Sequence, residues 1–171
     1  MSENLFDILE RGIADPQATA IETLSGERIA YADLVARTGR WANALTGLGV
    51  QPGDRVAVQV EKSVEAIILY LATARAGAVF LPLNTGYTPT EIDYFVGDAR
   101  PRVFVCDPAR AEVLAPVAEK AGAVLVTLGA DGKGTLADAA DAASPDFATV
   151  PRQADDLAAL LYTSGTTGRS K

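Results

Sequence analysis

Histidine is absent from this sequence of 171 residues, and cysteine occurs only once, as Cys106. Without histidine, the chain alone cannot assemble a Ser-His-Asp or Cys-His catalytic group, nor a zinc site with histidine ligands. A single cysteine also excludes an internal disulfide and any metal site that needs several cysteines. These two absences exclude the commonest hydrolase and zinc chemistries for these residues taken alone.

Basic residues and long apolar runs are scarce as well. The sequence has 15 Lys and Arg residues against 22 Asp and Glu residues, a net charge of −7, which argues against a nucleic-acid surface. The most apolar run, Ala66 to Ala74, has nine residues, whereas a membrane-spanning helix needs about 20. Because no basic segment precedes an apolar one at the N-terminus, we expect no secretory signal, a cytoplasmic location, and neither nucleic-acid nor membrane partners.

What the sequence does contain is an alternation of helical and extended patterns. With 49% hydrophobic and 22% charged residues, it is typical of a folded globular chain. The apolar spacing predicts a short helix near Leu5 and a hairpin that turns at 25–27. It further predicts helices over 34–48, 64–76, 89–100, 108–121 and 136–142, and strands over 55–60, 79–83, 103–106, 124–127 and 157–162.

Strands that are separated by helices need crossover connections, which favour parallel pairing. The strands are almost continuously apolar, as expected for a sheet that is covered on both sides. We therefore predict an α/β fold with a layered, largely parallel sheet and helices on both faces. In this fold Cys106 is expected to be a buried strand thiol and Trp41 a core residue. The acidic stretch over 131–156 is expected to be a solvated loop rather than a metal site.

The last nine residues, 163–171, carry the clearest sign of chemistry. Four of their first five non-glycine residues bear a hydroxyl group, two glycines and two cations accompany them, and the stretch holds no carboxylate. Glycine lets the backbone turn tightly and come close to a ligand. Free N–H groups, hydroxyl donors and cations at the end of a parallel strand suit phosphate oxygens. The stretch therefore predicts a phosphate-binding loop.

This loop matches neither of two common nucleotide-binding patterns. A Walker A loop has Lys and then Ser or Thr directly after its second glycine, whereas here Gly168 is followed by Arg169, Ser170 and Lys171. The three-glycine spacing of a dinucleotide fingerprint is also missing. On composition alone, a flexible Gly/Ser/Thr tail or linker is the alternative. The apolar strand before the loop and the cations at its end favour phosphate binding.

Residues 162–171, Tyr-Thr-Ser-Gly-Thr-Thr-Gly-Arg-Ser-Lys, resemble the phosphate-loop motif of the adenylate-forming superfamily. That superfamily includes acyl-CoA synthetases, peptide-synthetase adenylation domains and luciferases. Residues 29–34 and 75–84 resemble its first and second core motifs, and 53–58 its early strand. One departure is Ser170, where the family usually has a proline that would stiffen the loop. The Gly-Arg-Ser-Lys ending and the turn at 84–87 are most similar to malonyl-CoA synthetases, including relatives that act on methylmalonate.

The resemblance implies an AMP-forming ligase that activates a small carboxylate with ATP and Mg²⁺ and then transfers the acyl group to CoA. The substrate carboxylate is itself the nucleophile, so such an enzyme mainly positions reactants and stabilises charge. No catalytic residue and no metal ligand is expected within these 171 residues. By resemblance, the phosphates would accept hydrogen bonds from the hydroxyl groups of Thr163, Ser164, Thr166 and Thr167. The path of the loop would depend on Gly165 and Gly168. The charge of the pyrophosphate would be neutralised in part by Lys171.

The resemblance also implies a position within a longer protein. Residues 1–171 would form the N-terminal portion of the large AMP-binding domain, up to the phosphate loop at 163–171. The remainder of that domain and a small C-terminal domain would follow, with the residues that bind adenine, magnesium and the acid. We expect the 171 residues alone to be inactive. Two alternatives stay open: an amino-acid adenylation domain that loads a carrier protein, and a non-enzymatic nucleotide-binding or interaction domain.

Overall fold

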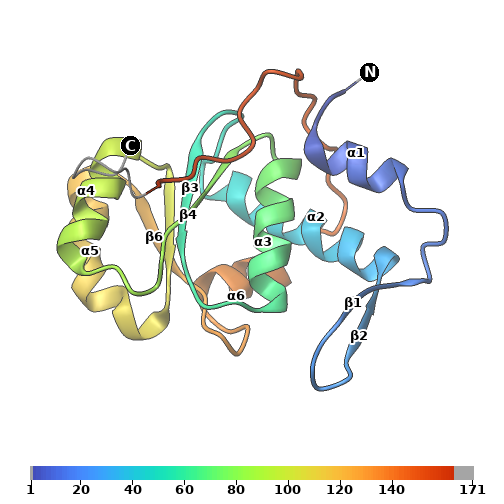
Figure 1. Ribbon diagram of the computed structural model, residues 1–171, viewed down its shortest axis with the longest axis horizontal. Coiled ribbons are helices and arrows are strands. Elements are labelled where there is room, and N and C mark those ends of the chain that lie inside the picture. Colours follow the sequence, from blue (N-terminus) through green and yellow to red (C-terminus); the bar gives the residue numbers. More distant parts are fainter. Residues whose placement is uncertain (1, 164–171) are drawn as a thin grey trace.

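The computed structural model describes residues 2–163, and a parallel sheet of four strands lies at its centre (Figure 1). Each strand is followed by a helix on a face of the sheet, which is what parallel crossover connections require. The prediction of a layered α/β fold is therefore confirmed. The strands are β3 (Arg55–Gln59), β4 (Val79–Pro82), β5 (Val103–Cys106) and β6 (Val124–Thr127), in the spatial order β4-β3-β5-β6.

Helices cover both faces of this sheet (Figure 1). Neighbouring residues of β3 point to opposite sides: Val56 packs in one hydrophobic cluster, and Ala57 packs in the other. One cluster joins the sheet to three helices and the other joins it to two, so each face has its own core. The first face holds α2 (Tyr31–Gly47), α3 (Val64–Arg75) and α6 (Thr135–Asp141), and the second holds α4 (Pro89–Ala99) and α5 (Ala111–Ala121).

The N-terminal part adds a helix and a hairpin beside this core. Helix α1 (Leu5–Arg11) contacts α3, and strands β1 (Thr19–Glu22) and β2 (Arg28–Ala30) pair in antiparallel fashion. The hairpin turns through Gly26, whose positive φ of 86° is a conformation that glycine adopts without strain. The predicted short helix and hairpin are both confirmed.

Local capping explains where two of the helices begin. The hydroxyl of Ser63 accepts a hydrogen bond from the backbone N–H of Ala66 at 3.1 Å, at the start of α3. At the start of α4, Thr88 and Glu91 form a reciprocal capping box, followed by Pro89 in the first turn. These signals lie within four residues of sequence, which is why the sequence predicts both boundaries.

The structure corrects two expected elements. The helix predicted over 108–121 is divided into a short 3-10 helix, η1 (Pro108–Arg110), and α5. The carboxylate of Asp107 caps η1 by accepting a hydrogen bond from the backbone N–H of Ala109 at 2.8 Å. The strand predicted over 157–162 is reduced to a single parallel bridge between Ala159 and Phe80.

Two residues that the sequence assigns to the core are buried as expected. The thiol residue Cys106 in β5 is fully buried, and Trp41 of α2 is 4% exposed.

In residues 131–156, α6 is followed by a segment without regular structure. Among the described residues, no three His, Cys, Asp or Glu side chains gather as metal ligands would. None of the helices in residues 2–163 combines the length and apolar character that crossing a bilayer requires.

Candidate functional site

The carboxyl edge of the sheet collects polar side chains from several connections. Gln59 ends β3, Asn84 follows β4 and Asp107 follows β5. In open parallel α/β sheets, ligands bind in the crevice outside the carboxyl ends of the strands. This edge is therefore the candidate location of a ligand site.

The turn after β4 is fixed at this edge by one side chain from β3 and one from η1. The amide nitrogen of Gln59 donates to the backbone carbonyl of Asn84 at 2.8 Å. The guanidinium of Arg110 donates to the carbonyls of Thr85 and Tyr87 at 3.1 and 3.0 Å. The turn therefore has a defined path although it lacks regular structure.

Gln59 also presents an unused acceptor. Its side chain is 1% exposed, and its carbonyl oxygen Oε1 has no hydrogen-bond partner among the described residues. A buried polar atom that lacks a hydrogen bond destabilises the fold, so most such atoms in native structures bond to another protein group or to an ordered water. Gln59 thus adds an acceptor near the end of the central strand.

The chain that leads to the predicted phosphate loop runs along β4. Phe80 donates its backbone N–H to the carbonyl of Ala158 at 3.0 Å, and Leu160 donates to the carbonyl of Phe80 at 2.9 Å. Since this pairing is parallel, the chain heads toward the carboxyl edge. The pairing involves Phe80 alone and so forms a bridge rather than a strand, and Leu157 and Leu161 nearby are 63% and 66% exposed.

Aromatic rings attach the end of this segment to α4. The ring of Tyr162 lies 4.6 Å from that of Phe95, which in turn lies 4.8 Å from the ring of Tyr87 in the turn after β4. The hydroxyl of Tyr162 donates to the carboxylate of Asp98 at 2.5 Å. Burial raises the pKa of Tyr162, and the hydrogen bond to Asp98 raises it further, so the phenol stays a donor.

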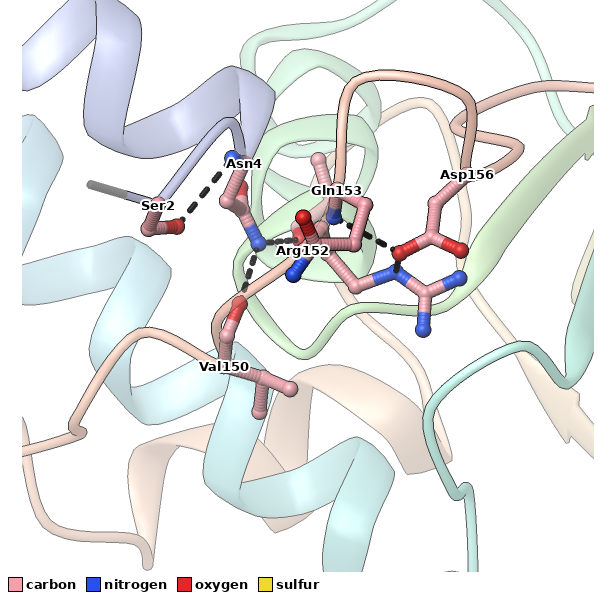
Figure 2. A network of polar contacts seen from close by, with 7 residues as sticks. Ser2, Asn4, Val150, Arg152, Gln153 and Asp156 are labelled. Carbon is pink, nitrogen blue, oxygen red and sulfur yellow. Dashed lines mark hydrogen bonds and ion pairs between the residues drawn. The ribbon is translucent and has the colours of Figure 1, made fainter.

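The beginning of the same segment is tied to the N-terminus by a buried amide (Figure 2). The side chain of Asn4 is 1% exposed and donates to the carbonyls of Ala74 and Val150 at 2.7 and 2.8 Å. Its oxygen accepts from the backbone N–H of Phe6 at 2.8 Å, which caps α1. One side chain therefore joins α1, the end of α3 and the segment that leads toward the predicted loop.

A second part of this network orders the next turn (Figure 2). The guanidinium of Arg152 lies 3.1 Å from the carboxylate of Asp156, which also accepts from the backbone N–H of Gln153 at 2.8 Å. The backbone N–H of Glu3 donates to the carbonyl of Arg152 at 2.9 Å. The path of the chain into the β4 bridge is thus fixed by contacts at Val150, Arg152 and Asp156.

Of the predicted phosphate-loop residues, Thr163 is the one that the structure describes, and its side chain is exposed. It follows Tyr162 directly and so stands at the end of the attached segment. The others lie outside the described residues: Ser164, Gly165, Thr166, Thr167, Gly168 and Lys171.

Residues 10–171 match the family of AMP-binding enzymes. The chain belongs to this family. Feruloyl-CoA synthase of an Amycolatopsis species is 39% identical over 163 residues, and the long-chain-fatty-acid–CoA ligase FadD13 of Mycobacterium tuberculosis is 34% identical over 166 residues. Each alignment covers 95% of this chain but 31% and 32% of the relative. The chain therefore spans about a third of the length of these relatives.

A solved structure of similar sequence agrees with this family. ATP-bound MatB from Rhodopseudomonas palustris is 60% identical, with a TM-score of 0.97 over 100% of this chain and 34% of its own. Apo MatB from the same organism gives 59% identity and a TM-score of 0.96. The resemblance of the sequence to adenylate-forming enzymes is thus confirmed, and so is the fold that it implies.

Sequence reasoning missed the residues that hold the site in place. Asp98, Gln59 and Arg110 belong to none of the quoted motifs, and their contacts are with residues 64, 25 and 23 positions away. The one available signal was Gln59 itself, a polar residue that directly follows the apolar Val56, Ala57 and Val58. An uncharged amide at that position is consistent with bonding to a neighbouring loop.

Proposed function

We propose that this chain belongs to an AMP-forming acid–thiol ligase. Such an enzyme uses ATP to convert a small carboxylate into an acyl-adenylate and then forms the thioester with CoA. The observation that carries the proposal is the hydroxyl- and glycine-rich sequence over 163–171, which directly follows a chain fixed along β4. Membership of the AMP-binding enzymes and the likeness to an ATP-bound structure both support it.

In this proposal, residues 163–171 hold the phosphates of ATP. Hydroxyl groups donate to phosphate oxygens without adding fixed charge, and a single cation can then stabilise the pyrophosphate that leaves. The hydroxyl donors are Thr163, Ser164, Thr166 and Thr167, the glycines of the loop are Gly165 and Gly168, and the cation is Lys171.

Mg²⁺ is part of the proposal as the partner of ATP. Magnesium usually retains several waters and binds through one or two carboxylates together with substrate phosphates. We place its protein ligands in the remainder of a longer protein, and a cytoplasmic location stays a prediction.

The domain assignment is a proposal of the same kind. The relatives and solved structures are about three times as long as the stretch they share with this chain. We propose that residues 1–171 are the N-terminal portion of a large AMP-binding domain, and that they are inactive alone. Pyrophosphate exchange catalysed by the purified 171-residue chain would contradict this assignment.

Malonate or methylmalonate is the proposed acid. The support is the likeness of the loop ending and of the turn at 84–87 to malonyl-CoA synthetases. An amino-acid adenylation domain is the second candidate, since the chain also aligns at 35% identity with a probable nonribosomal peptide synthetase of Salinispora arenicola. A non-enzymatic nucleotide-binding domain is the third.

The complete protein separates these candidates. It is supplied with ATP, Mg²⁺ and hydroxylamine, and in turn with malonate, methylmalonate, acetate or a mixture of amino acids. We expect hydroxamate from malonate or methylmalonate, with AMP released and no carrier protein required. Amino-acid-dependent hydroxamate would support the adenylation domain instead. Binding of ATP without turnover of any acid would support the non-enzymatic domain.

A further inference from the structure

Tyr162 is the last residue before the predicted phosphate loop, and its attachment to α4 differs from the other contacts of its segment. It makes a ring contact with Phe95 and a hydroxyl bond to Asp98, which lies 64 residues away in sequence. Successive Cα atoms are about 3.8 Å apart. Any contact that fixes Tyr162 therefore restricts the position of Thr163, the first hydroxyl residue of the proposed site.

The carboxylate of Asp98 adds little to the stability of the fold. Asp98 lies exposed on the last turn of α4, and exposed polar pairs contribute little to folding because water competes for both partners. The ring of Tyr162 is half-buried against Phe95 and already holds the side chain on α4. What the bond to Asp98 adds is direction, because it fixes which way the phenol points.

We propose that Asp98 is a positioning residue for nucleotide binding, which acts by holding Tyr162 and thereby the first residue of the phosphate loop. This inference rests on the proposed function, because it assigns the ATP phosphates to residues 163–171. It assigns to α4 a role that none of the sequence motifs indicates. Asp98 would not touch the nucleotide itself.

The same helix provides a matched control. Asp93 of α4 pairs with Lys120 of α5 at 2.7 Å, and the two side chains are 37% and 70% exposed. Asp93→Ala removes a carboxylate from the same helix but leaves Tyr162 in place. A nonspecific effect of charge or of helix stability would therefore appear in both aspartate variants.

The test is the dissociation constant of ATP for the complete protein, measured by titration calorimetry with Mg²⁺ present. We expect Asp98→Ala and Tyr162→Phe each to weaken ATP binding about tenfold, because Thr163 is then no longer held in position before the nucleotide binds. Asp98→Asn retains an acceptor oxygen and should restore most of the affinity. The double variant, Asp98→Ala with Tyr162→Phe, should bind no more weakly than either single variant, since both remove the same bond.

The outcomes separate this inference from the proposed function. If wild-type protein does not bind ATP, the proposed function fails and the inference fails with it. If wild-type protein binds ATP and Asp98→Ala binds equally well, the positioning role alone is wrong. Equal losses in Asp98→Ala and Asp93→Ala, or a fall in melting temperature of more than about 4 °C in the Asp98 variants, would assign Asp98 a structural role instead.

Discussion

The segment over 145–163 is attached at its beginning and at its end in two different ways. At its beginning, buried side chains donate to backbone carbonyls: Arg75 is 7% exposed and donates to Phe147, and Asn4 is 1% exposed and donates to Val150. At its end, the half-buried Tyr162 contacts one ring and one exposed carboxylate.

The difference separates contacts that stabilise the fold from contacts that we assign to the proposed phosphate site. Buried donors and acceptors are costly to leave unpaired, so the first attachment specifies the architecture. Exposed polar contacts contribute little to stability, so the second can change without unfolding the protein. This contrast predicts that variants at the beginning of the segment will lose stability and variants at its end will lose ligand binding.

The largest loss of stability is expected at Gly39, inside α2. A β-carbon there would overlap the backbone carbonyl of Pro145, which cannot move without shifting the whole segment. We expect Gly39→Ala to lower the free energy of unfolding by about 3 kcal/mol. Gly47→Ala is the control in the same helix, because nothing lies within 4 Å of its β-carbon. Urea titration of both variants measures the difference, and equal stability would show that the segment is not packed on Gly39.

A smaller loss is expected at Arg75, whose guanidinium donates to Val35, Thr38 and Phe147 and lies 4.7 Å from the ring of Phe6. Burial lowers its pKa, an effect that the nearby carboxylates partly oppose. Replacing it with methionine removes the donor of the Phe147 carbonyl, whereas the Val35 carbonyl keeps the hydroxyl of Thr38.

We expect Arg75→Met to destabilise the protein by about 2 kcal/mol. In the exposed pair of Arg28 and Glu22, Arg28→Met should cost less than about 0.5 kcal/mol. Thermal melting of the two variants compares them directly. Equal losses would contradict the distinction between buried and exposed attachments.

The buried thiol of Cys106 in β5 makes the stability of the fold depend on pH. Burial raises its pKa from 9.0 to about 11, and Asp107 adds to the shift while Arg110 opposes it. The folded chain therefore keeps the thiol proton where the unfolded chain has lost it. This contribution is present below pH 9 and disappears as the pH rises toward 11.

We expect wild-type protein to lose more stability than Cys106→Ala between pH 9 and pH 11, as urea titrations at both values would show.

At pH 8, labelling of the thiol should be slow in wild type and faster in Gly39→Ala. A thiol that reacts at once in the native protein would contradict its burial in β5.

The smallest effect on stability is expected at the other end of the segment. Tyr162→Phe retains the ring contact with Phe95 and removes the exposed hydroxyl bond to Asp98. The free energy of unfolding should change by less than about 0.5 kcal/mol. A loss as large as that of Arg75→Met, in the same thermal melt, would erase the contrast between the two ends.

Sequence alone predicted the features whose causes are local. The capping box of Thr88 and Glu91 and the cap at Ser63 each depend on residues three positions apart, and the apolar strands show that both faces of the sheet are covered. The predicted start of α5 was wrong because the three residues after the Asp107 cap form the 3-10 helix η1 before the α-helix begins. The strand over 157–162 was wrong because an apolar run does not reveal how many partners it will have.

For the candidate site, the motif over 163–171 predicts the residues but not the contacts that hold the chain before them. The Tyr162–Asp98 bond joins residues 64 positions apart, and the contacts of Gln59 and Arg110 with the turn at 84–87 are also long-range. No periodicity or spacing encodes such pairs, because they depend on how helices and strands pack. The fold had to be known before they could be identified.

The proposal that residues 163–171 bind the phosphates of ATP is tested most directly by ATP–pyrophosphate exchange. The exchange is measured with the complete protein, in wild type and in the double variant Thr166→Ala with Thr167→Ala. Two hydroxyl donors to phosphate would be lost together, at about 1.5 kcal/mol or more each. We expect malonate-dependent exchange in wild type, a loss of about 100-fold or more in the variant, and the same melting temperature in both. Exchange that is unchanged in the variant would contradict a phosphate site in residues 163–171.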